Sequence, residues 1–155
     1  MTIDEQTLQQ VVTDVCSGML GLELEPTSDS SCNEANALSA VVRISGGWES
    51  LVQVLAPRKT AVAIASTMFA MSEDELSEAE IRDAVGEIVN MVGGNLKGIS
   101  EGDSSLSLPC VGEATGSGPF GSDFEGLCVA NRCQGDPLIV RVFDCSLASR
   151  AVAAT

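Results

Sequence analysis

The spacing of apolar residues along the chain predicts two amphipathic helices. Apolar residues recur at intervals of three and four from Leu8 to Leu22, which places them on one face of a helix. A second helix is predicted over residues 78–97, and Ser77 precedes Glu80 with the spacing of a capping box at its start. The apolar stripe of this second helix consists of Ile81, Val85, Ile88 and Val92. Both helices therefore have one face to bury against another layer.

Short apolar runs predict strands, and the residues between them predict two hairpins. Gly46 and Gly47 separate the first pair of runs, and two glycines supply the positive φ angles that a tight turn requires. The segment from Gln134 to Pro137 separates the second pair and has a turn composition. The four runs cover residues 37–44, 51–55, 127–133 and 138–145.

The remaining segments predict one short helix, one broken strand and two loops. Pro57 is expected in the first turn of a helix that reaches Phe69, because a residue in that turn does not need its N–H. Residues 106–111 predict a strand interrupted by a proline, which indicates an edge or terminal position. Residues 26–33 and 112–123 are rich in small, polar and turn-forming residues and are expected to be loops.

Together these elements predict an α+β fold with two layers. The strands occur as hairpins, so the sheet should be mostly antiparallel, and the one-sided helices should pack on one face of it. The chain has 155 residues, which is the size of one domain, and we expect a single domain over residues 1–155.

The charge balance bears on the classes of partner. The chain carries 22 acidic against 8 basic side chains, for a formal charge of −14. Such a surface repels phosphate backbones and anionic lipid headgroups, so neither nucleic acid nor a membrane surface is an expected partner. The amino terminus has no signal-peptide pattern, and no apolar run approaches the roughly 18 residues of a membrane helix. We therefore expect a cytoplasmic protein.

The sequence contains no histidine and six scattered cysteines. The absence of histidine excludes the Ser-His-Asp and Cys-His nucleophile systems and most catalytic zinc sites. The cysteines include no C-x-x-C pair, so we expect small buried thiols rather than metal ligands or a disulfide framework. We also expect no cofactor and no metal of the protein's own.

A polar stripe follows the second predicted helix, opposite its apolar stripe. It consists of Asp83, Glu87, Asn90, Gly94 and Lys97, at intervals of four and three. Glu87 and Asn90 are one turn apart and can reach the same external ligand. Carboxylates on an exposed helix face are also common without any function. However, Asn90, Gly93 and Gly94 together cost the helix about 2–3 kcal/mol. Gly86 and Gly93 are expected to allow close packing of another element, whereas Gly94 leaves space for a partner beside Asn90.

The same residues resemble a known family. Asp83, Glu87 and Asn90, with the run that continues to Asn95, resemble the signature of the CheC/CheX/FliY-type phosphatases of bacterial chemotaxis and are most similar to CheX. The later Ser107-Leu108-Pro109 segment is similar too, although the 18 residues between Asn90 and Pro109 are fewer than is usual in the family. The order of elements is also similar, so the resemblance spans nearly the whole chain.

The resemblance implies an enzyme that hydrolyses the phosphoryl-aspartate of a CheY-like response-regulator receiver. It implies that Asn90 orients the attacking water, that Glu87 contacts a lysine of the receiver, and that Asp83 supports the pair. Gly94 and Pro109 are the further motif residues. The receiver would supply its own Mg²⁺, and the protein would form a homodimer in which sheet edges meet.

Two other interpretations stay open. In the first, the chain is a noncatalytic receiver-binding or scaffold module of the same fold. In the second, it is an unrelated domain whose helix matches the motif by chance. The intact pair of Glu87 and Asn90 favours catalysis. In the first predicted helix, Asp14 and Ser17 occupy the corresponding positions without a carboxamide, so we expect one site per chain.

Overall fold

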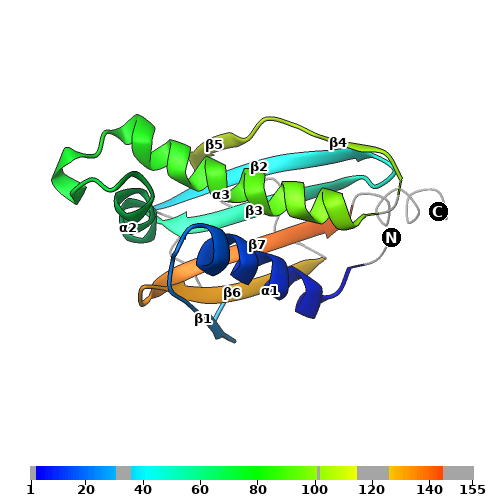
Figure 1. Cartoon of the computed structure of the whole chain (residues 1–155), viewed down its shortest axis with the longest axis horizontal. Helices are drawn as coiled ribbons and strands as arrows, with labels where there is room; N and C mark the ends of the chain where they lie inside the picture. Colours follow the sequence, from blue (N-terminus) through cyan, green and yellow to red (C-terminus); the bar gives the residue numbers. More distant parts are fainter. Residues whose placement is uncertain (1–2, 31–35, 101, 115–125, 145–155) are drawn as a thin grey trace.

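The computed structural model of the chain describes residues 3–30, 36–100, 102–114 and 126–144. Within these residues, seven strands form one sheet, and every strand pair in it is antiparallel. Helices cover one face of this sheet (Figure 1). The predicted α+β fold with two layers is therefore confirmed.

The helices and strands follow the chain in the order helix, three strands, two helices and four strands. The helical segments are α1 (Glu5–Thr13), the π-helical η1 (Asp14–Met19), α2 (Arg58–Phe69), the 3₁₀ turn η3 (Glu73–Glu75) and α3 (Glu78–Ile99). The strands are β1 (Leu24–Thr27), β2 (Ala37–Gly46), β3 (Ser50–Pro57), β4 (Ser104–Leu106), β5 (Cys110–Glu113), β6 (Leu127–Cys133) and β7 (Asp136–Asp144). The sheet order is β1-β6-β7-β3-β2-β4, and β5 also pairs with β2. The strands β4 and β5 therefore share one edge.

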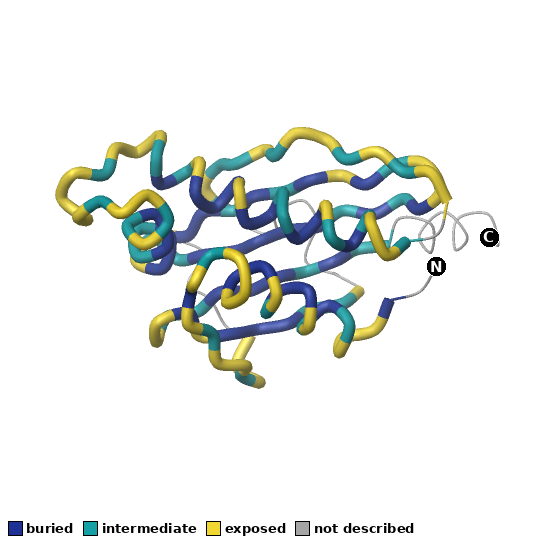
Figure 2. Tube along the Cα trace, viewed as in Figure 1, coloured by how far each residue is buried: buried dark blue, intermediate teal, exposed yellow. Residues whose placement is uncertain are grey.

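The main core lies between the sheet and the helices. Val42 of β2, Val52 of β3 and Val140 of β7 are fully buried beneath the helices. The apolar stripe predicted on α3 is buried as well, with Ile81 the most exposed of its four residues at 5%. Figure 2 shows the buried strands beneath helices whose outer turns stay exposed. Each such side chain stabilises the fold by about 1.5–3 kcal/mol, and this burial determines which face of α3 points outward.

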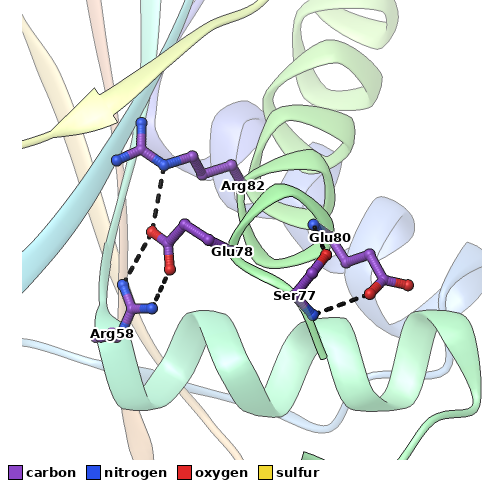
Figure 3. A network of polar contacts seen from close by, with 5 residues as sticks. All are labelled: Arg58, Ser77, Glu78, Glu80 and Arg82. Atoms are coloured by element: carbon purple, nitrogen blue, oxygen red, sulfur yellow. Dashed lines mark hydrogen bonds and ion pairs between the residues drawn. The ribbon is translucent and has the colours of Figure 1, made fainter. Parts of the chain in front are cut away.

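Polar contacts fix the start of α3 (Figure 3). The Ser77 hydroxyl accepts a hydrogen bond from the Glu80 backbone N–H at 3.2 Å, and the Glu80 carboxylate accepts one from the Ser77 N–H at 2.9 Å. This is the predicted capping box. The Glu78 carboxylate accepts a hydrogen bond from Arg82 at 3.3 Å and also pairs with Arg58 of α2. The bond from Arg58 lowers the pKa of Glu78 to about 2, so the contact between α2 and α3 stays charged near neutral pH.

The first predicted helix changes its type part-way. α1 ends at Thr13, and the chain continues as a π-helix in which the Leu20 N–H donates to the Val15 carbonyl at 3.1 Å. This wider turn shifts the phase of the exposed positions. Met19, which the periodicity placed on the apolar face, is 57% exposed as a result.

Several of the other predicted boundaries hold. Both hairpins are present, and Gln134 and Gly135 adopt positive φ angles of 54° and 90° at the tip of the second. The strand predicted over residues 106–111 is broken as expected, since β4 ends at Leu106 and β5 begins at Cys110. Both parts pair with β2 at the edge of the sheet.

Three expectations for the turns and loops were wrong in part. Pro26 lies in β1, which pairs with β6, rather than in a loop. Gly112 lies in β5, and residues 115–123 of the predicted loop fall outside the described part of the chain. Pro57 ends β3 and is the N-cap of α2, one position before the first turn.

Candidate functional site

One outward face of α3 carries the predicted site residues. At about 100° per residue, Asp83, Glu87, Asn90 and Gly94 fall within an arc of about 60° around the helix axis. Asp83, Glu87 and Gly94 are exposed, and Asn90 is half-buried. Lys97, near the end of the same stripe, is also half-buried. The fold therefore presents the four predicted α3 residues on a single surface.

The polar side chains of this face have no partner within the described part of the chain. Neither an ion pair nor a side-chain hydrogen bond engages Asp83, Glu87 or Asn90 there. The acidic residues one turn earlier differ, because Glu78 pairs with arginines and Glu80 belongs to the capping box. The two later carboxylates and the carboxamide are thus available to an external group.

The glycines of α3 fall into two kinds. A Cβ atom on Gly86 would lie 3.1 Å from Val111 Cγ2, and one on Gly93 would lie 2.7 Å from Val42 Cγ2. Both glycines are buried and allow the strands to approach the helix closely, as predicted. A Cβ on Gly94 would meet no atom within 4 Å, so Gly94 adjoins open space beside Asn90.

Pro109 reaches the site from a different part of the chain. It packs against Gly86 of α3, since a Cβ there would lie 3.7 Å from Pro109 Cβ. Pro109 also lines a groove of about 810 Å³ beside the start of α3. Its lining includes Arg82, Asp83 and Glu87 of α3, Leu108 and Pro109 between β4 and β5, and Met68 and Phe69 at the end of α2. Asn90 and Gly94 continue the same helix face beyond the groove.

The sequence analysis missed the apolar walls of this groove. Leu108 and Phe69 lie far apart in the sequence, and each belongs to an element boundary rather than to a periodic stripe. Phe69 ends α2 and Leu108 lies between β4 and β5, and α3 lies between α2 and β5 in Figure 1. The signal that the sequence offered here was Pro109 next to Leu108, which predicted a break in the strand but not an exposed side chain.

Four of the six cysteines lie in the described part of the chain, and none of these four belongs to α3. Cys16 and Cys133 are buried, as expected, and burial raises the pKa of the Cys16 thiol to about 12 and that of Cys133 to about 11. The expectation was wrong for Cys110, which is exposed on β5, and Cys128 is partly exposed. Cys32 and Cys145 lie outside the described residues.

The described residues contain neither a cluster of metal-binding side chains nor a membrane-spanning helix. In the described ranges, no three His, Cys, Asp or Glu side chains come close enough to hold a metal ion together. No helix among these residues has both the length and the apolar character needed to span a membrane. The chemistry available on α3 is therefore that of two carboxylates and a carboxamide that face outward.

The sequence over residues 38–117 matches the family model of the chemotaxis phosphatase CheX. This span covers just over half of the chain and contains α3 together with Pro109. The chain belongs to the CheX family. No curated protein sequence matches it significantly.

Solved structures of CheX-type and related proteins share the fold. The CheX protein of Vibrio vulnificus superposes with a TM-score of 0.70 at 20% identity, covering 89% of this chain and 93% of its own. CheX in the CheX-CheY-BeF₃-Mg²⁺ complex of Borrelia burgdorferi gives 0.66 at 16% identity, covering 92% of this chain and 98% of its own. FliY of Thermotoga maritima gives 0.56 at 18% identity, covering 97% and 96%. At such identities these similarities establish the fold.

Proposed function

We propose that this CheX-family protein accelerates hydrolysis of the phosphoryl-aspartate on a CheY-like response-regulator receiver. The observation that carries the proposal is the outward face of α3, where Glu87 and Asn90 lie one turn apart without partners among the described residues. A CheX protein of this fold is known in complex with CheY, BeF₃ and Mg²⁺. We propose that this reaction takes place in the cytoplasm.

The proposed reaction needs little chemistry from the visiting protein. Water attacks phosphorus, the bond between phosphorus and the aspartyl oxygen breaks, and inorganic phosphate and a free carboxylate result. The acyl phosphate is already activated, and the receiver supplies the Mg²⁺ that neutralises the developing charge. A protein without histidine, nucleophile or metal of its own can therefore act by positioning the water in line.

Asn90 suits the positioning role. A carboxamide can donate one hydrogen bond and accept another, so it can hold a water in a defined orientation. It also adds no negative charge beside the phosphoryl group, which a carboxylate would repel. In the proposal Glu87 pairs with a receiver lysine, Asp83 supports this contact, and the open space at Gly94 admits the receiver surface.

Point substitutions on α3 test the proposal. Phosphoryl decay on a CheY-like receiver, loaded with a small phosphodonor, is followed with and without the protein. Asn90→Ala should lower the rate about 10²–10⁴-fold and leave receiver binding largely intact. Glu87→Ala should mainly weaken binding. The matched controls are Asn95→Ala, whose side chain bonds within its own helix, and Glu75→Ala in η3.

The outcomes separate the alternatives. If the wild-type protein binds the receiver without any gain in decay, the chain is a receiver-binding or scaffold module. If Asn90→Ala retains full activity, the proposed mechanism is wrong. If Asn90→Ala unfolds the protein, the residue is structural.

We also propose a homodimer in which sheet edges meet. Edge strands carry unpaired backbone groups that a second sheet can satisfy, and the two edges here are β1 and β4 with β5. Light scattering at micromolar concentration tests this, and a species of only 16.0 kDa would contradict it.

A further inference from the structure

Leu108 is an apolar side chain left in solvent beside the site. It is 88% exposed, more than Met19 at 57%, Ile99 at 44% or Phe69 at 39%, which are the other exposed large apolar residues described. A single exposed leucine has no significance by itself. Its position does, because Leu108 lines the same groove as Asp83 and Glu87.

The backbone that carries Leu108 is held on both sides. The Ser107 N–H donates to the Arg43 carbonyl at 2.9 Å, and the Ser107 hydroxyl accepts from the Arg43 N–H at 2.8 Å. On the other side, Pro109 and Val111 pack against Gly86 of α3. Leu108 is thus presented from a fixed segment rather than from a free loop, and a preorganised anchor loses little entropy on binding.

The groove combines an acidic surface with apolar walls. Asp83 and Glu87 lie on α3 beside Arg82, whose guanidinium pairs with Glu78. Leu108 comes from one neighbouring segment and Phe69 from another. A complementary partner presents a basic side chain with apolar residues beside it. In the proposed function, the basic group is the receiver lysine that Glu87 contacts. The receiver surface next to this lysine then reaches Leu108.

We propose that Leu108 is an apolar anchor for the receiver domain and determines affinity rather than the chemical step. This proposal rests on the proposed function, because it takes the receiver as the occupant of the groove. It gives the packing at Gly86 and Pro109 a purpose, which is to hold Leu108 at a fixed distance from Glu87. Asn90 lies beyond the groove on the same helix face, so the loss of Leu108 leaves the water-positioning group unchanged.

The test compares Leu108→Ser with Leu108→Met and with Ile99→Ser. The last is a matched control, because Ile99 is also exposed but ends α3 and does not line the groove. Binding to a receiver loaded with BeF₃ and Mg²⁺ is titrated, and KM and kcat are measured for phosphoryl decay. Leu108→Ser should raise Kd and KM about tenfold with kcat unchanged. Leu108→Met and Ile99→Ser should resemble the wild type.

The outcomes distinguish a failure of the Leu108 proposal from a failure of the proposed phosphatase function. If the wild type binds and hydrolyses but Leu108→Ser keeps its Kd and KM, only the anchor proposal fails. If Leu108→Ser shifts the oligomeric state with unchanged receiver affinity, the side chain serves contact between copies and the proposal is overturned. If the wild type binds no receiver, the proposed function fails and the anchor fails with it.

Discussion

Two adjacent glycines of α3 should respond in opposite directions to the same substitution. Gly93 and Gly94 share a helical backbone, so replacing either with alanine should gain about 1 kcal/mol of helix propensity. Their surroundings differ. The new methyl group at position 93 would lie 2.7 Å from Val42 Cγ2 and 3.0 Å from Leu106 Cδ1, whereas position 94 is open to beyond 4 Å.

The magnitudes follow from these distances. Contacts under 3.0 Å require Val42 or the helix to move, and Val42 is fully buried in β2 with a stiff, branched side chain. Overpacking of this kind costs about 1–3 kcal/mol, which exceeds the propensity gain over most of its range. Net of the propensity gain of about 1 kcal/mol, Gly93→Ala should lower the free energy of unfolding by up to about 2 kcal/mol, and Gly94→Ala should raise it by about 0.5–1 kcal/mol.

Urea unfolding measures both changes. Trp48 is the single tryptophan and is 3% exposed, so its fluorescence reports on the hydrophobic core. The midpoint should fall for Gly93→Ala and rise for Gly94→Ala at an unchanged m-value. A Gly93→Ala protein that is more stable than the wild type would refute the packing argument. A Gly94→Ala protein less stable than the wild type would refute the claim that position 94 adjoins open space. Gly94→Ala should also slow receiver dephosphorylation, since its methyl group narrows the space beside Asn90.

Three further predictions concern other parts of the fold. Glu78→Gln should destabilise the protein at pH 7 but not near pH 2, because Arg58 on α2 lowers the folded-state pKa of Glu78 from 4.5 to about 2. The stability that the charged carboxylate contributes is therefore present above pH 4.5 and is lost as the pH falls through the folded-state pKa. Urea midpoints measured at several pH values check this. Gln9→Ala should cost about 1–3 kcal/mol in chemical denaturation, because it leaves the fully buried amide of Asn131 without its partner at 2.9 Å. Iodoacetamide at pH 8 should modify exposed Cys110 in the native protein but not Cys16, because burial raises the pKa of the Cys16 thiol to about 12. Peptide mass mapping shows which thiol reacts, and equal labelling of the two would contradict the buried position of Cys16.

Elements with strong local signals could be predicted from the sequence. α3 begins at Glu78 as expected and ends at Ile99, close to the predicted residue 97. Its bounds could be predicted because the apolar stripe and the capping box indicate the same helix. β1 could not be found in this way. It has four residues, and its place depends on pairing with β6, where Leu24 lies opposite Cys133. Such pairing joins segments far apart in the chain, so local composition does not reveal it.

The candidate site also has one part that the sequence could predict and one part that it could not. Asp83, Glu87, Asn90 and Gly94 share one helix, and helical periodicity is enough to place them on one face. The groove beside them depends on segments that only the folded chain brings to α3, the end of α2 and the break before β5. The sequence predicted that Pro109 interrupts a strand, but not that the break carries an exposed Leu108 to the site.

The architecture also contains a counterpart of α3, and its details favour one site per chain. The strand order places β3 and β7 at the centre, with β2 and β6 beside them and β4 and β1 at the edges. α1 packs on β6 in one half, as α3 packs on β2 in the other. Asp14, the first residue of η1, already accepts a hydrogen bond from Gln10 of α1 at 2.9 Å. The π-helical turn that begins at Asp14 also shifts Ser17 away from the position one α-helical turn above it. At this counterpart the Asp14 carboxylate is engaged and Ser17 is out of phase with it, whereas α3 keeps Glu87 and Asn90 aligned one turn apart.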